Sequence, residues 1–130
     1  MYLLDTNSLI YFFKGVGDVA SHLLNTAPKD VSIPAIAYYE LQVGIRKSTS
    51  PQKRITQLHQ LTQLLNIIAF GAEEAVHAAN IRAALERRGQ TIGPYALLIA
   101  GTALAHALVL VSHNTDEFTR IADLKVVDWF

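Results

Sequence analysis

Residues 2–8 read YLLDTNS, and this stretch decides the fold of the chain. Residues 2–4 predict a short buried strand. The hydroxyl and amide side chains after Asp5 precede an apolar run at residues 9–13, which predicts the start of a helix. Asp5 therefore stands at the end of a strand, where open α/β sheets bind their ligands. It is either the N-cap of the helix or a ligand of a metal or phosphate, since Asp is also a favoured cap residue.

The composition of the chain limits its domain number, its chemistry and its possible partners. The chain has 130 residues, of which 51% are hydrophobic, and this suits a single domain over residues 1–130 with one substantial core. It has no cysteine, which excludes disulfides, thiolate metal sites and a cysteine nucleophile and fits a reducing cytoplasm. Eleven basic residues balance eleven acidic ones. A nucleic-acid partner would therefore have to be bound by a local basic patch.

One apolar run resembles a membrane segment. Residues 95–111 are almost wholly apolar, but they contain Thr102 and His106, follow Pro94, and are short for a span of about 20 residues. The run also lacks basic flanks, and residues 1–5 lack the basic region of a signal peptide. We therefore expect a buried helix followed by a buried strand, with no membrane association and a cytoplasmic location.

Strand and helix patterns alternate along the rest of the chain. Further strands are predicted at residues 31–33, 66–70 (or an extended connection), 108–111 and 126–127. Helices are predicted at residues 6–13, 18–25, 35–47, 52–65, 73–88 and from Pro94 onward, the last with a stripe of small residues at Ala96, Ala100, Ala103 and Ala107. This alternation predicts an α/β fold, a three-layer α/β/α domain with a central, mainly parallel twisted sheet flanked by helices.

A second carboxylate lies in an apolar stripe. Glu40 falls on the predicted apolar face of residues 35–47, which consists of Ile36, Ala37, Leu41, Val43 and Gly44. A carboxylate there is costly unless it is paired, protonated or bound to a metal. Glu40 is therefore either a metal ligand or a helix-edge residue that reaches solvent or a basic partner. The five histidines show no spacing typical of a metal site.

Four segments of the chain resemble a known protein family. The segments LLDTN at residues 3–7, IPAIAYYELQVGIRKS at 33–48, GQTIGPYALLIAGTALAHALVLVSHNTDEF at 89–118 and RIADLKVVDWF at 120–130 are similar to PIN-domain toxins of the VapC type. The resemblance implies a Mg²⁺- or Mn²⁺-dependent endoribonuclease of a toxin–antitoxin system that cleaves structured RNA such as tRNA. It also implies a VapB-type antitoxin partner and a homodimer, or a heterotetramer or hetero-octamer with the antitoxin.

The resemblance also implies site residues. The acidic, metal-binding and catalytic positions carry over to Asp5, Glu40 and Glu117. Residues that would support this pocket are Thr6, Asn7, Ser112, Asn114 and Asp116. Candidates for RNA binding are Arg46, Lys47, Lys53, Arg54 and His113, although charged residues at helix ends are commonly only solvated.

Position 96 departs from the family pattern. Family members commonly read IGPYD, with an Asp that helps to hold the metal, whereas this chain reads IGPYA with Ala96. Either natural drift or a deliberate knock-out of a toxic nuclease would produce this change, and the knock-out is the interpretation we favour. We expect weak metal binding and impaired or absent cleavage in this form.

Two other function classes remain. A degenerate PIN domain would bind RNA or an antitoxin without cutting. A phosphatase that uses Asp5 as its nucleophile would need a second acid at position 7, where an Asn stands that cannot act as general acid or base.

The missing carboxylate has a consequence for stability. Two carboxylates about 5 Å apart repel by about 3 kcal/mol at an effective dielectric constant of about 20. Without metal, this chain should therefore be at least as stable as its Ala96→Asp variant. Thermal unfolding of both proteins in EDTA measures this, and a clearly lower melting temperature for the Ala96 form would contradict it.

Overall fold

The computed structural model describes residues 1–130 and contains a five-stranded sheet. Its strands are β1 (Tyr2–Leu4), β2 (Val31–Pro34), β3 (Asn66–Ile68), β4 (Val109–Val111) and β5 (Val126–Val127), in the order β3-β2-β1-β4-β5. Every neighbouring pair is parallel, so the expected parallel α/β sheet is confirmed. Because all strands run the same way, their carboxyl ends share one edge.

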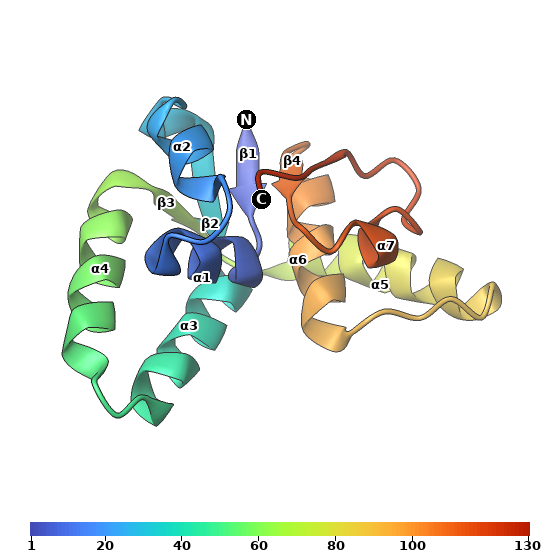
Figure 1. The fold of residues 1–130 in the computed structure, drawn as a ribbon. Coiled ribbons are helices and arrows are strands. Elements are labelled where there is room, and N and C mark those ends of the chain that lie inside the picture. Colours follow the sequence, from blue (N-terminus) through green and yellow to red (C-terminus); the bar gives the residue numbers. More distant parts are fainter.

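The helices join these strands and cover the sheet. They are α1 (Thr6–Lys14), α2 (Val19–Leu24), α3 (Ala35–Lys47), α4 (Pro51–Leu64), α5 (Ala72–Arg87), α6 (Pro94–Ala105) and α7 (Thr115–Phe118), with a 3₁₀ turn at Pro28–Asp30. Figure 1 shows α2, α3 and α4 on the side of β2 and β3, and α5, α6 and α7 on the side of β4. The bounds agree closely with the predicted helices, apart from α7, for which no helix was predicted.

The central strand is the most buried part of the sheet. Leu3 and Leu4 in β1, and Leu110 and Val111 in β4, have no exposed surface. The ladder between the two strands continues one residue further, because Asp5 N–H donates to the carbonyl of Val111 (3.1 Å). Asp5 is thereby fixed to the end of both strands.

Helices α5 and α6 pack through a glycine. The predicted small-residue stripe is buried only at its centre, at Ala100 and Ala103, while Ala107 is exposed beyond the helix end. The close approach occurs instead at Gly101, where an added Cβ would lie 2.7 Å from the Cβ of Ala78. The stripe predicted a close helix contact, but the residue that makes it lies beside the stripe.

Two details differ from the predicted patterns. Gly44 is exposed, and Ile45 takes its place on the buried face of α3 together with Ala37 and Leu41. The one-turn helix α7 has too few residues to show a periodic apolar pattern.

The apolar run that ends in β4 forms a helix and a strand as expected, and none of the helices has the length and hydropathy needed to cross a membrane.

The α5–α6 contact yields a test. Gly101→Ala should lower the free energy of unfolding by about 1–3 kcal/mol, because the new methyl group overpacks a rigid helix contact. Gly44→Ala is the matched control, since a Cβ there meets nothing within 4 Å and Ala favours a helix. Urea unfolding of both variants measures the difference, and equal stabilities would contradict this packing.

Candidate active site

The structure confirms one of the two roles that the sequence left open for Asp5, that of a helix cap. Asp5 is the N-cap of α1, with a carboxylate oxygen that accepts the Ser8 N–H at 2.9 Å. The side chain is nevertheless almost fully buried at the carboxyl ends of β1 and β4, with 5% of the residue exposed. Since most capping residues lie at the surface, the burial of this one requires a further explanation.

The electrostatics of Asp5 are those of a carboxylate without a counter-ion. Burial raises its pKa above 3.8, and hydrogen bonding by Ser112 and Ser8 opposes this rise only in part. The negative charge of Asp128 raises the pKa further. The ion pairs of the structure are Arg82–Glu86, Glu74–His106 and His113–Asp128, so no cationic side chain pairs with Asp5.

Thr6, the residue after Asp5, binds Glu40. The Thr6 hydroxyl, which directly follows Asp5, donates to Glu40 Oε1 at 2.6 Å. The contact spans 34 positions of the chain and brings the middle of α3 to the start of α1. Glu40 is partly buried and has no basic partner. The helix-edge interpretation with a basic partner is therefore excluded.

The end of β4 closes the pocket from the other side. Ser112 is fully buried, and its hydroxyl accepts the Asn114 N–H at 3.0 Å. We call the group formed by Asp5, Thr6, Glu40 and Ser112 the Asp5 pocket. Asn114 reaches it through its backbone, and its side chain does not cap α7.

Three predicted residues are not joined to the Asp5 pocket. The carboxylates of Asp116 and Glu117, on α7, make no hydrogen bond or ion pair, and Asn7 is exposed beside the pocket without a side-chain contact. No group of three or more acidic, histidine or cysteine side chains is arranged to hold a metal. The expected cluster of three carboxylates does not form in this structure, and the ligand role of Glu117 remains a prediction.

Position 96 lies near Glu40. Ala96 is partly buried in the first turn of α6, next to Tyr95. The Tyr95 ring meets the Tyr39 ring edge-on with centroids 5.8 Å apart, which locates the start of α6 beside α3. Hydrogen bonding to Tyr39, with a smaller contribution from the negative charge of Glu40, raises the pKa of Tyr95. A carboxylate at position 96 would therefore add negative charge near Glu40, but Ala96 contributes none.

The carboxylates of the Asp5 pocket can be compared with the ligands that a divalent ion requires. Mg²⁺ takes oxygen ligands, usually one or two carboxylates with several waters. Asp5 and Glu40 supply two carboxylates without basic partners, and a bound cation would offset the cost of burying Asp5. The residues present therefore fit such an ion in ligand chemistry, although with fewer carboxylates than the sequence implied.

Comparison with known proteins identifies the family. The PIN domain pattern matches residues 2–124. The chain is 32% identical to the "tRNA(fMet)-specific endonuclease VapC" of Salmonella typhimurium, over 98% of this chain and 97% of that protein. It is 33% identical to "Ribonuclease VapC2" of Haemophilus influenzae over 98% and 97%. The chain belongs to the PIN domain family.

Solved structures agree with this assignment. VapBC2 from Rickettsia felis, bound to a DNA fragment from its promoter, contains a chain with a TM-score of 0.92 and 33% identity, covering 99% of this chain and 98% of that one. DNA-bound VapBC from Salmonella typhimurium gives a TM-score of 0.92 at 31% identity, with 99% and 98% covered. The predicted resemblance to VapC-type PIN domains is confirmed.

A groove borders Glu40 in this PIN domain. It lies between α1, α3 and α4, has a volume of about 270 Å³ and is lined by Ile10, Phe13, Lys14, Glu40, Leu41, Gly44, Ile45, Ser48, Arg54 and Leu58. Glu40 thus belongs to both the pocket and the groove. Of the predicted RNA-binding residues, only Arg54 lines this groove, with its guanidinium 5.8 Å from the Phe13 ring centre.

The other basic candidates are not gathered there. Arg46 is exposed and bonds to Gln42 on its own helix, while Lys47 and Lys53 are exposed without a partner. The four basic candidates for RNA binding are thus not assembled around the groove.

His113 has a partner that the sequence analysis did not identify. Its ring donates from Nδ1 to Asp128 Oδ2 at 2.8 Å, beyond the ends of β4 and β5. Partial burial acts to raise the pKa of Asp128, but hydrogen bonds from Phe130 N–H and His113 lower it overall. Asp128 follows the strand that neighbours β4, and this position was the one signal that could have identified it.

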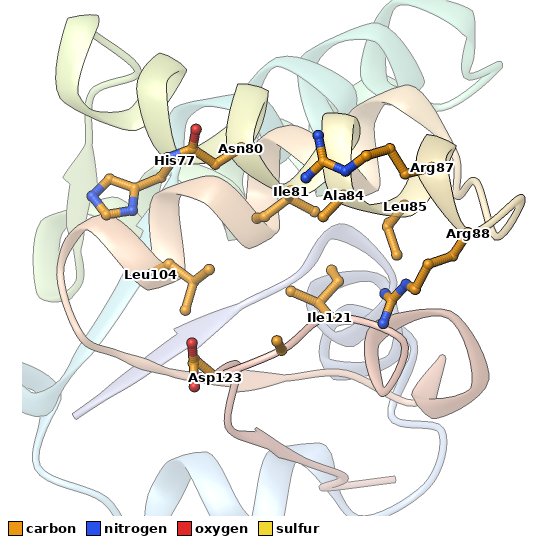
Figure 2. Close-up of a pocket in the computed structure, with 11 residues that line it drawn as sticks. His77, Asn80, Ile81, Ala84, Leu85, Arg87, Arg88, Leu104, Ile121 and Asp123 are labelled. Carbon is orange, nitrogen blue, oxygen red and sulfur yellow. The ribbon is translucent and has the colours of Figure 1, made fainter.

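A cavity larger than the groove lies elsewhere in the domain. It measures about 470 Å³ between α5, the end of α6 and residues 121–123, and Figure 2 shows His77, Asn80 and Arg87 on α5 with Asp123 across the opening. None of the predicted site residues lines it. Arg88, which also lines it, donates to the carbonyl of Arg120 and so has a structural role.

The buried state of Asp5 predicts a pH dependence of stability. Its folded-state pKa is raised, so its stabilising contribution is complete below pH 3.8 and is lost as the pH rises through the folded-state value. Asp5→Asn keeps the cap and has no charge. The variant should therefore gain stability relative to the parent with rising pH, by about 1.4 kcal/mol for each unit of pKa difference.

Urea unfolding of both proteins in EDTA, from below pH 3.8 to neutrality, measures this effect. Asp5→Ala is the control, because it removes both the charge and the cap and should be less stable than Asp5→Asn by about 1 kcal/mol at every pH. A parent protein that gains stability over Asp5→Asn with rising pH would show that Asp5 has an unrecognised cationic partner.

Proposed function

We propose that this PIN domain is the toxin of a VapBC-type toxin–antitoxin system, a metal-dependent endoribonuclease with Asp5 and Glu40 at its centre. The observation that supports this most strongly is the desolvated Asp5 carboxylate at the carboxyl end of β1, without a basic partner, in a chain similar to VapC ribonucleases over nearly its whole length. Charged groups that are this deeply buried are usually paired with an opposite charge or bound to a metal.

In this proposal some residues of the chain bind the ion and others position those ligands. Asp5 and Glu40 would hold Mg²⁺ or Mn²⁺, with Glu117 as a further candidate, and the Thr6 hydroxyl orients Glu40 toward Asp5. Ser112 and the Ser8 N–H hold the Asp5 carboxylate in place. When bound, the ion would activate water and stabilise charge on the phosphate. With Ala96, one ligand is missing, and metal binding and cleavage should both be weak.

The substrate class follows from the relatives. Structured RNA, with tRNA as one example, is the proposed substrate, because one relative is named a tRNA(fMet)-specific endonuclease. An RNA substrate would place the protein in the cytoplasm. With no net charge, the chain would contact RNA through local groups such as Lys14 and Arg54 at the groove.

An antitoxin of the VapB type is the proposed protein partner. The structural neighbours include VapBC complexes, and the groove between α1, α3 and α4 offers apolar walls with Glu40 at one end. A peptide segment with a basic side chain would match both features. Exposed Tyr39, Val76 and Tyr95 offer apolar surface for the proposed homodimer or for higher assemblies with the antitoxin.

A non-catalytic role is the second candidate. Ala96 and the lack of a three-carboxylate cluster favour a degenerate PIN domain that binds RNA or an antitoxin without cleavage. Restoring the carboxylate distinguishes the two functions.

Ala96→Asp should gain Mg²⁺-dependent RNA cleavage by at least about 10-fold over the parent, since even outer-shell partners of a metal change activity by 10- to 100-fold. Cleavage of a tRNA substrate by both proteins measures this, with EDTA and the double variant Ala96→Asp/Asp5→Asn as negative controls. Ala96→Asn is the matched control for side-chain size. Equal cleavage by parent and Ala96→Asp would refute the ligand role, and inactivity of both would favour the non-catalytic domain.

A further inference from the structure

Three aromatic rings meet beside the Asp5 pocket. The His113 imidazole stacks on the Phe130 ring with centroids 4.2 Å apart and an angle of 21°. The Tyr11 ring meets both edge-on, at 6.0 Å from His113 and 4.9 Å from Phe130. We call these three rings the His113 platform. Two of them come from segments after β4 and β5, and the third lies on α1.

One carboxylate fixes the stacked pair. Asp128 Oδ2 accepts from the His113 ring at 2.8 Å, and Asp128 Oδ1 accepts the Phe130 N–H at 2.9 Å. The Phe130 carbonyl accepts the Asp18 N–H, and a Cβ at Gly17 would lie 2.6 Å from that carbonyl oxygen. The platform is therefore held by polar contacts on both sides of Phe130.

The platform follows the same strand ends as the Asp5 pocket. Asp5 N–H donates to the carbonyl of Val111 at 3.1 Å, and the next residue, Ser112, donates its N–H to the carbonyl of Val127 at 2.9 Å. His113 directly follows Ser112, and Asp128 directly follows Val127. Because β1, β4 and β5 are neighbours in a parallel sheet, their following residues lie along one edge. A chain of RNA with a phosphate at Asp5 would thus pass close to these rings.

The rings are also accessible. The His113 side chain is 46% exposed, the Asp128 side chain 38%, and Phe130 40%. Rings that served only the core would be buried, as Trp129 is. Exposed, preorganised aromatic faces beside a phosphate-processing site are the feature that proteins use to stack unpaired RNA bases.

We propose that the His113 platform binds an unstacked base of the RNA, next to the phosphate that a divalent ion at the Asp5 pocket would hold. This rests on the proposed function. Asp128 is a positioning residue that acts through His113 and Phe130. The platform would favour single-stranded loops over continuous duplexes, because a base in a duplex cannot stack on a protein ring without leaving its neighbours.

Binding of a fluorescein-labelled oligouridine, measured by fluorescence anisotropy with Mg²⁺, tests this. The Ala96 protein is suited to it because its cleavage is expected to be weak. His113→Ala should weaken binding by about 5- to 150-fold, the range for loss of one stacked base. His113→Phe, which keeps a flat ring, should retain most of the binding. An oligonucleotide with abasic sites should bind to the parent protein as weakly as the intact one binds to His113→Ala.

A second readout detects the stacking itself. With 2-aminopurine placed in turn along the oligonucleotide, the parent protein should quench its fluorescence at one position, and His113→Ala should abolish the quenching. His22→Ala is the matched control, because His22 also stacks on an aromatic ring, at 5.3 Å from Trp129, but on α2 and outside the platform. It should leave both binding and quenching unchanged.

The outcomes separate the platform from the proposed function. If the parent binds RNA but His113→Ala binds it equally well, or if intact and abasic oligonucleotides bind alike, the platform proposal is overturned and the ribonuclease proposal stands. If the parent binds no RNA and Ala96→Asp cleaves none, both are overturned. If His113→Ala weakens binding of an antitoxin peptide but not of RNA, the platform is a protein contact and the proposal is likewise overturned.

Discussion

Parallel pairing of β1 between β2 and β4 is the constraint on which the remaining structure depends. It buries both faces of β1 and leaves only its carboxyl end free to contact a ligand. The residue at that end is Asp5, and the ladder to Val111 holds it beside Ser112. Parallel strands need long crossovers, and here the crossovers are the helices that bring Glu40 to the same edge. The chemistry of the site is thus a consequence of strand direction.

Burial of Asp5 without a cation has a cost that the domain tolerates. Hydrogen bonds from Ser8 and Ser112 reduce this cost but do not remove it, and the pKa stays raised. Such an uncompensated carboxylate is typical of sites that gain their counter-ion with a ligand. With Ala96 the site has one carboxylate fewer than the family pattern. The carboxylates therefore repel one another less without an ion, and they should also bind an ion less tightly. The same substitution that should weaken catalysis should therefore ease folding.

Local patterns were sufficient for most of the fold and for part of the site. Apolar runs and caps predicted the strands and long helices, and the end of the first strand pointed to Asp5. That Thr6 and Glu40 belong to one site was implied only by the family resemblance, since they lie 34 positions apart, and their hydrogen bond was not predicted. The pair of His113 and Asp128 was not predicted, because its one signal, the position of each residue after neighbouring strands, becomes visible only once the strand order is known.

The central claim is that Asp5 and Glu40 together form the divalent-cation site of this domain. Paramagnetic broadening of amide signals by Mn²⁺, in ¹⁵N-labelled protein, tests it most directly. The account predicts that broadening begins at the amides of Thr6, Glu40 and Ser112, is displaced by excess Mg²⁺ and disappears in Asp5→Asn. Broadening that is centred elsewhere, or that persists unchanged in Asp5→Asn, would contradict it.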